Sequence, residues 1–218
     1  MTSEMRQIRP DLWQTRTDTP FPGLTTHAYL WTGPERNVLF YCPATDADFD
    51  TIEKLGGVDD QYLSHQDEAG PMLARIADRF GSRLHAPAAE LARIGRHAHI
   101  DVPLADRHVD SNGVEVVPTP GHSPGSTCYL VPGAQGETYL FTGDTTFVGD
   151  DGTWTTYLVR GVSDPDGPIR GSIEQDGLDP YAQAGFDDEY AASQTQKLDC
   201  WPRSNIGTFF RPPGCHRV

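Results

Sequence analysis

A rigid loop around His122 carries the first side chain that could do chemistry. Between residues 118 and 125, three prolines fix φ and remove backbone donors, and two glycines can take backbone angles that other residues resist. Apolar runs from Gly113 to Val117 and from Cys128 to Val131 flank the loop and are typical of strands. Taken alone, His122 is either a preorganised functional histidine, which needs such a rigid support, or an incidental histidine in a rigid surface turn.

Two further stretches place histidine and carboxylate side chains after predicted strands. Residues 60–71 predict a short strand that runs into the start of a helix, and they include His65, Asp67 and Glu68. Residues 138–144 form an apolar run that ends in Gly143-Asp144. Imidazole and carboxylate groups are ligands that zinc hydrolases use, so these stretches match what a metal hydrolase needs.

Together the three stretches resemble the metallo-β-lactamase superfamily. Its pattern is a His-x-His-x-Asp-His loop, a Thr-Pro-Gly-His-Thr/Ser-Pro-Gly-Ser loop and a strand that ends in Gly-Asp. Residues 119–126 match the second element and residues 138–144 the third. The resemblance spans residues 6–160 and implies an αββα sandwich and a metal-dependent hydrolase of glyoxalase-II-like type.

The first loop departs from the family pattern. His65 stands at the first histidine position, but Asp67 occupies the second, Ala69 the aspartate and Gly70 the last histidine. Ala69 and Gly70 cannot coordinate through side chains, so the second metal of a dinuclear site has lost two ligands. We therefore expect one zinc ion at most, while iron or manganese also suits an imidazole and carboxylate set.

The predicted metal ligands are His65, Asp67, His122 and Asp144, and the predicted catalytic residues are Asp144 and Glu68. Alternatives stay open for each. His65 is otherwise a histidine on the approach to a helix, Asp67 a helix N-cap and Asp144 a turn aspartate. For Glu68 the two functional roles are a base or a group that supports a ligand.

The leading functional hypothesis is a hydrolase that uses a metal-activated water on an ester, thioester or related bond. The competing hypothesis is a catalytically inactive relic of the fold that serves as a binding domain. The changed first loop and the atypical C-terminal segment favour the second hypothesis. The superfamily includes lactam, thioester and phosphodiester hydrolases, and the fold alone does not assign a substrate among them.

Composition limits the partners of the chain. A formal net charge of −14 over 218 residues argues against a nucleic-acid-binding face, which needs clustered lysine and arginine. The first eight residues lack a signal-peptide core, and no segment approaches the length of a membrane span, so we expect a soluble, cytoplasmic protein with a small-molecule substrate and no membrane partner. The oligomeric state stays open. Four well-separated cysteines predict buried thiols rather than a zinc knuckle or disulfide framework.

The patterning predicts an α+β or α/β chain of strands, then helices, then strands. The clearest helix covers residues 72–80, where apolar residues recur at three- and four-residue spacing and Gly81 follows. Predicted strands include 6–16, 25–32, 37–42, 84–87, 114–117, 127–131, 138–141, 145–148 and 154–159, and a shorter helix covers 46–55. His97 and His99 are spaced like a pair of metal ligands, but they lie in a polar linker, which favours a solvated loop over a metal site. His85, His108 and His27 are treated likewise, as lone histidines without a partner.

The character of the chain changes after Gly161, where proline and glycine interrupt every candidate periodicity. The predicted domains are therefore a metallo-β-lactamase-like domain over 1–162 and an atypical tail over 163–218 with little stable helix or strand. Two explanations stay open for the tail. It is a disordered or loosely docked segment, or it is an altered and incomplete second half of the sandwich in which His216 is a remnant.

Overall fold

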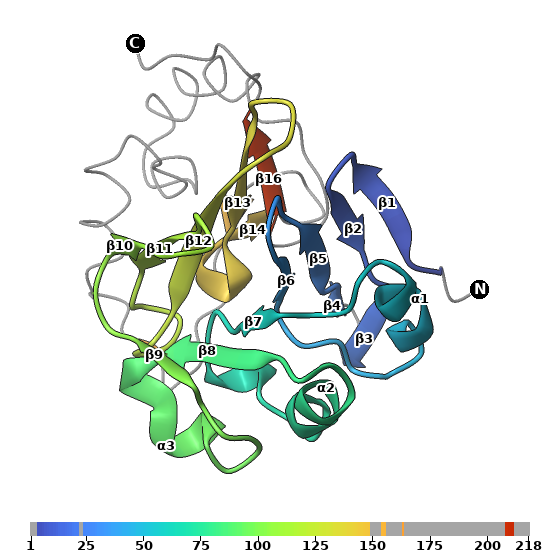
Figure 1. The fold of residues 1–218 in the computed structure, drawn as a ribbon. Coiled ribbons are helices and arrows are strands. Elements are labelled where there is room, and N and C mark those ends of the chain that lie inside the picture. The colour runs from blue at the N-terminus through green and yellow to red at the C-terminus, as the bar shows by residue number, and fades with distance from the viewer. Residues whose placement is uncertain (1–3, 22–23, 149–153, 156–162, 164–207, 212–218) are drawn as a thin grey trace, which may run out of the picture. The chain divides into compact units, whose positions relative to one another are not determined.

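The computed structural model describes residues 4–21, 24–148, 154–155, 163 and 208–211 (Figure 1). The chain divides into two compact units, residues 1–105 and residues 106–218, and each contains one main sheet. The sequence motifs fall in both: the His65 loop belongs to the first unit, and the His122 loop with Asp144 belongs to the second.

A mixed seven-stranded sheet forms the first unit, in the order β1-β2-β5-β6-β7-β8-β9 (Figure 1). Neighbouring strands run antiparallel from β1 to β6 and parallel from β6 to β9. The strands are β1 (Arg6–Arg9), β2 (Leu12–Gln14), β5 (Tyr29–Thr32), β6 (Asn37–Phe40), β7 (Asp60–Tyr62), β8 (Arg83–Pro87) and β9 (Val102–Leu104). A two-stranded ribbon, β3 (Asp18–Phe21) and β4 (Leu24–Thr26), accompanies them.

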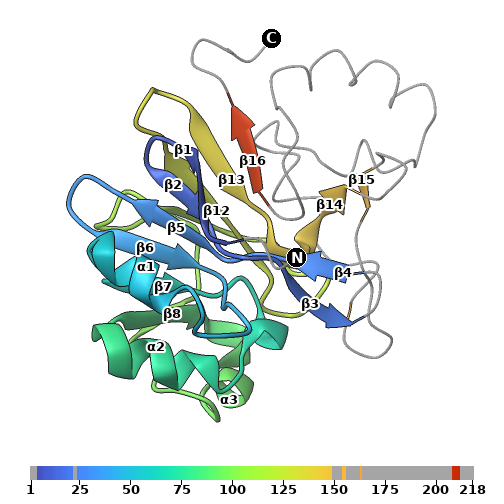
Figure 2. The ribbon, with the colours of Figure 1, turned by 90° about the vertical axis from the view of Figure 1, so that its right-hand side faces the viewer.

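Helices connect the parallel strands, as parallel pairing requires a crossover. They are α1 (Phe49–Lys54), α2 (Met72–Phe80) and α3 (Leu91–Ile94), and Figure 2 shows α1 and α2 next to each other on the sheet. Phe49 and Phe80 pack edge to face with ring centroids 5.1 Å apart. A buried cluster under the segment that follows β7 joins α2, β8 and α3 and comprises Leu63, Leu73, Leu84, Ala86 and Ile94.

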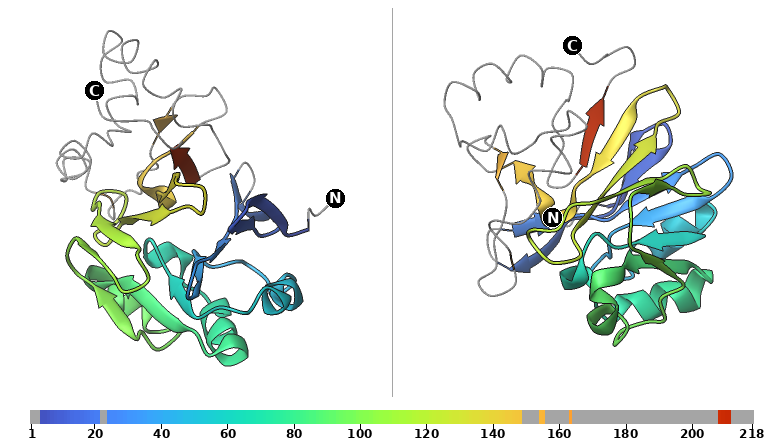
Figure 3. Two further views of the ribbon diagram at one scale, coloured as in Figure 1. Left: turned by 45° about the horizontal axis from the view of Figure 1, so that its top comes forward. Right: turned by 90° about the vertical axis from the view of Figure 1, so that its left-hand side faces the viewer.

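An antiparallel five-stranded sheet forms the second unit, in the order β10-β11-β12-β13-β16. Figure 3 shows its long central strands, with β16 beside β13. The strands are β10 (His108–Val109), β11 (Glu115–Pro118), β12 (Thr127–Pro132), β13 (Thr138–Phe141) and β16 (Thr208–Arg211), and a ribbon of β14 (Phe147–Val148) and β15 (Trp154–Thr155) is separate from this sheet. The loop from β11 to β12 and the end of β13 carry the second set of motif residues.

Most predicted elements agree with the structure, and a few are wrong. The helix predicted over 72–80 is confirmed, and Gly81 ends it in the left-handed conformation. The single strand predicted over 6–16 is wrong, because a turn at Pro10 and Asp11 divides it into β1 and β2. Asp11 supports that turn by accepting a hydrogen bond from Trp31 Nε1 at 3.0 Å. The predicted 25–32 strand divides likewise into β4 and β5, and residue 145 belongs to a turn rather than a strand.

Little stable helix or strand is expected in residues 163–218, and the structure describes two parts of this segment. Residues 208–211 form β16, which pairs with β13 from Thr138↔Arg211 to Phe141↔Thr208, so this part of the segment completes an edge of the second sheet. Ser163 is also described, and the remaining residues of the segment lie outside the described ranges. Among the helices that the structure describes, none has the length and apolar character to cross a bilayer.

A buried carboxylate ties neighbouring strands of the first sheet together. Asp60, at the start of β7, is fully buried and lies 2.7 Å from Arg83 Nη2 and 2.8 Å from His85 Nε2. The His85 ring stacks on Tyr62 with centroids 4.0 Å apart. Since a buried carboxylate is costly without such partners, this cluster constrains the register of β7 and β8.

We expect Gly81→Ala to lower the free energy of unfolding by about 1 kcal/mol, because φ is +68° at this position and an alanine there is strained. A Cβ at Gly81 would meet nothing within 4 Å, so packing contributes no penalty. Gly70→Ala is the matched control, since its Cβ site is equally open and its φ is not left-handed. Urea denaturation measures both. Equal stability of the two variants would contradict the backbone explanation.

Asp60→Asn should lower the free energy of unfolding by about 2–3 kcal/mol, less than the roughly 3–5 kcal/mol of a fully buried pair, because its partners Arg36 and Arg83 reach solvent. The neighbouring Asp59→Asn is the control. Asp59 is exposed and accepts a hydrogen bond from the Asn37 backbone at 2.8 Å, so its loss should cost less than about 1 kcal/mol. A smaller effect at Asp60 than at Asp59 would show that the buried cluster does not stabilise the sheet.

Candidate metal centre

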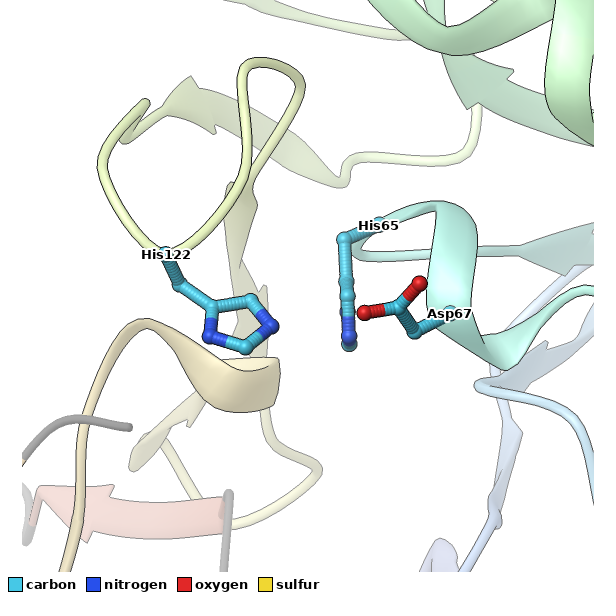
Figure 4. Close-up of side chains that lie close together, drawn as sticks. All are labelled: His65, Asp67 and His122. Atoms are coloured by element: carbon cyan, nitrogen blue, oxygen red, sulfur yellow. The ribbon is translucent and has the colours of Figure 1, made fainter. Parts of the chain in front are cut away.

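The segment after β7 brings His65 into the interior of the first unit. His65 has extended backbone angles, φ −166° and ψ 174°, and a turn of 3-10 helix over Gln66–Glu68 follows it. Its side chain is 3 % exposed. Figure 4 shows His65 and Asp67 on this segment. The alternative of a histidine that merely precedes a helix does not account for the polar groups arranged around its ring.

A chain of hydrogen bonds determines how the His65 ring is presented. Ser64 Oγ lies 2.9 Å from His65 Nδ1 and also donates to the Glu68 carboxylate. Since the serine proton is used toward Glu68, Ser64 Oγ accepts from Nδ1–H, and Glu68 Oε1 is 3.2 Å from the same nitrogen. This arrangement favours the tautomer with the proton on Nδ1, in which the lone pair of the ring lies on Nε2.

Two carboxylates fix the backbone of the same segment. Glu90, which is 4 % exposed, accepts a hydrogen bond from the Gln66 backbone N–H at 2.7 Å. Glu68 likewise accepts from the Ser64 backbone N–H at 3.1 Å. Hydrogen bonds from N–H groups to ionised carboxylates are among the stronger ones in proteins. The His65 segment is therefore held from two sides.

Asp67 differs from His65 in its surroundings. Its side chain is 37 % exposed, and Oδ1 lies 3.2 Å from Arg93 Nη2. The alternative that Asp67 is a helix N-cap is wrong, because the N-cap position of α2 is Pro71 and the 3-10 turn has no side-chain cap. Its carboxylate is thus directed to a cation at the surface of the unit.

Hydrogen bonds within the loop after β11 make the support of His122 rigid. Thr119 N donates to Ser126 O at 2.7 Å, and Ser123 N donates to Ser126 Oγ at 2.9 Å. Ser163 Oγ donates to the His122 carbonyl at 2.6 Å. His122, drawn on this loop in Figure 4, is 2 % exposed, so it is not an incidental histidine of a surface turn.

His122 and Asp144 come together in the second unit. Nε2 of His122 lies 3.6 Å from Oδ2 of Asp144, which confirms that these two strand ends converge. Asp144 sits in a 3-10 turn over Gly143–Thr145, where Gly143 has a φ of +51°. A hydrogen bond of 2.9 Å between Thr119 Oγ1 and Thr145 Oγ1 joins the His122 loop to this turn. Their roles as ligands stay a prediction.

The spacing of this pair fits a shared ion. Two ligand atoms bound at roughly 2.0–2.1 Å to a tetrahedral zinc ion are about 3.3 Å apart. The observed 3.6 Å is close to that value and exceeds the usual length of a direct hydrogen bond. His65, Asp67 and His122 each offer one nitrogen or oxygen ligand atom as well, so the donor chemistry of the predicted set suits a divalent metal.

The cysteines in the described part of the chain do not supply a nucleophile. Burial raises the pKa of Cys42 to about 12, with a further contribution from the negative charge of Glu68. Burial also raises the pKa of Cys128 to about 11. Both groups are thiols at neutral pH, which disfavours cysteine-based covalent catalysis.

Sequence reasoning missed several residues that organise the site. Ser64, Glu90 and Arg93 contact the His65 segment, but a serine, a glutamate and an arginine carry no motif signal of their own. His85 was treated as lone, and the structure shows that it pairs with Asp60. The four-residue spacing of Ser64 and Glu68, which suits one helical turn, is a sequence signal that could have indicated their contact.

Comparisons with known proteins agree with these motifs. The family model described as "Metallo-beta-lactamase superfamily" matches residues 58–195. No curated protein matches the sequence. The match continues past residue 162, so the family resemblance reaches into the segment predicted to be atypical.

Solved structures share the fold at low sequence identity. A metallo-β-lactamase family protein from Thermus thermophilus is 17% identical, with a TM-score of 0.59 over 88% of this chain and 82% of that chain. A metallo-β-lactamase from Pontibacter korlensis is 15% identical, with a TM-score of 0.56 over 95% and 93%. A metallo-β-lactamase from Cronobacter sakazakii, described by its "HARLDQ motif", is 20% identical, with a TM-score of 0.54 over 81% and 67%.

These likenesses confirm the predicted α+β sandwich of metallo-β-lactamase type. The family model covers more than half of the 218 residues, and the chain belongs to the metallo-β-lactamase superfamily, whose members are metal-dependent hydrolases.

Proposed function

We propose that the protein is a hydrolase that binds one zinc ion through His65, Asp67, His122 and Asp144 and cleaves an ester, thioester or related bond in a small molecule. The observation that carries the proposal is the His122–Asp144 pair, whose 3.6 Å spacing suits two ligands of one ion. Iron or manganese is compatible with the same ligand types. A thioester would be the substrate of a glyoxalase-II-like enzyme.

The predicted ligands suffice for one metal ion. Ala69 and Gly70 occupy two ligand positions of the family loop and have no coordinating side chain. A divalent ion bound by the four residues would supply a water with a pKa of about 7 and would polarise the carbonyl under attack. The protein itself would have to orient the ligands and accept the proton of the attacking water.

The roles of the protein groups follow from their contacts. Ser64 and Glu68 hold the Nδ1–H of His65, which orients the ring and raises the basicity of Nε2. Because Glu68 is engaged in this way, we favour a supporting role for it over that of a base. Asp144, which is 36 % exposed, would accept the proton of the attacking water.

A second candidate function is a binding domain without catalysis. The observation that favours it is the contact between Asp67 and Arg93, because an ion must compete with the guanidinium for this carboxylate. The two candidates differ in metal content and in turnover, so the same protein preparation distinguishes them.

As isolated, the protein should contain up to one equivalent of zinc, measured by plasma mass spectrometry, and should hydrolyse at least one member of a panel. The panel comprises a chromogenic cephalosporin, an acyl thioester and a bis-aryl phosphate, and a thioester is the expected substrate. A chelator should abolish turnover and added zinc should restore it. His122→Ala provides the control for contaminating hydrolases. Metal binding without turnover on any member would favour the binding domain.

Zinc affinity tests the ligand set directly. Asp67→His should tighten zinc binding by about tenfold, because a neutral imidazole would complete a three-histidine set. His122→Ala should abolish binding in both backgrounds. Calorimetric titration against a competing chelator measures these affinities. An unchanged affinity in Asp67→His, or retained binding in His122→Ala, would show that these residues do not hold the ion.

A further inference from the structure

A short basic stretch stands out in this acidic chain. The protein has 31 acidic residues against 17 lysines and arginines, yet residues 91–100 contain two arginines, two histidines and no acidic residue. The side chains of all four are exposed, and they are Arg93, Arg96, His97 and His99. Because the net charge repels anions at long range, a local cationic surface is the place where an anionic group can bind.

The backbone gathers these side chains on one turn. Arg96 N donates to Arg93 O at 3.3 Å and His97 N donates to Ile94 O at 2.9 Å, so the helical turn continues beyond α3. Residues three and four apart on such a turn are neighbours on its surface. Ile94 is fully buried in the cluster with Leu63 and Leu73, which anchors the turn next to the His65 segment.

Arg93 connects this surface to the proposed metal site. Its guanidinium lies 3.2 Å from Asp67, and solvent reaches both side chains, which are 56 % and 37 % exposed. An exposed ion pair contributes at most about 1 kcal/mol, so it is not needed to hold the fold. The contact itself shows that the Arg93 guanidinium can pair with a carboxylate at the position that Asp67 occupies.

We propose that Arg93, aided by Arg96 and His97, binds a carboxylate on the substrate and so makes the enzyme selective for anionic esters or thioesters. The proposal rests on the hydrolase function proposed above. Arginine suits this role because its planar group offers five donors in a fork that matches a carboxylate. A single contact to Asp67 leaves donors of the guanidinium for a second acceptor.

A matched pair of esters tests the selectivity. We would compare 4-nitrophenyl acetate with the monoester of 4-nitrophenol and succinic acid, which carries a free carboxylate, on the zinc-loaded full chain. Arg93→Ala should raise KM for the succinate ester about tenfold or more, the loss expected for a charged hydrogen bond, with little change in kcat. Because Arg93 also pairs with Asp67, the acetate ester reports any change at the metal site itself, and the ratio of kcat/KM for the two esters measures the selectivity. Arg93→Lys should retain part of the preference.

Arg75→Ala is the control for removing an exposed arginine. Arg75 is 57 % exposed and pairs with Asp46, on the α1–α2 side of the unit. It should leave both esters unaffected. An equal loss on both esters in Arg93→Ala, or a loss on the succinate ester in Arg75→Ala, would overturn the proposal.

A binding measurement separates this inference from the hydrolase function. Titration of succinate into chelator-treated protein, followed by calorimetry, should show binding in the wild type that is about tenfold weaker in Arg93→Ala. This result would support the carboxylate site even if neither ester is hydrolysed, which would contradict only the proposed function. Binding of inorganic phosphate in preference to succinate, or zinc affinity altered by Arg93→Ala with both esters unchanged, would overturn it.

Discussion

The largely buried carboxylate of Glu68 is the group on which the His65 segment depends. A carboxylate withdrawn from water is costly unless hydrogen bonds compensate, and Glu68 receives them from the Ser64 backbone and hydroxyl. Those bonds require the 3-10 turn that brings residue 68 back toward residue 64. The same turn places Ser64 against His65 Nδ1. One electrostatic requirement thus sets the backbone, the tautomer and the orientation of a predicted ligand.

The two non-coordinating positions of the loop have different physical explanations. Ala69 packs against the buried cluster that contains Leu63 and Leu73, where a carboxylate would lose its water. At Gly70 a Cβ would meet nothing within 4 Å, and the backbone is not left-handed, so no steric reason requires glycine. Position 69 thus packs against the core, while the Cβ site at position 70 is open.

The sequence predicted best those features that depend on local pattern. The 72–80 helix follows from its periodicity and from Gly81, and the approach of His122 to Asp144 follows from two strand ends in one sheet. The pairing of Asp60 with His85 was not predictable in this way. It depends on the parallel register of β7 and β8, in which Tyr62 lies opposite His85, and the intervening helix leaves no short-range signal of that register.

Each unit holds one buried imidazole and one carboxylate that solvent reaches: His65 with Asp67, and His122 with Asp144. Four protein ligands would close a tetrahedral zinc site, whereas hydrolysis needs a position for water. One carboxylate must therefore bind weakly or act on the water instead. Asp67 is the weaker candidate ligand, because Arg93 competes for its oxygen and a turn of only three residues carries it. In the proposed site, aspartate in place of histidine at position 67 would leave a coordination position for water, at the expense of metal affinity.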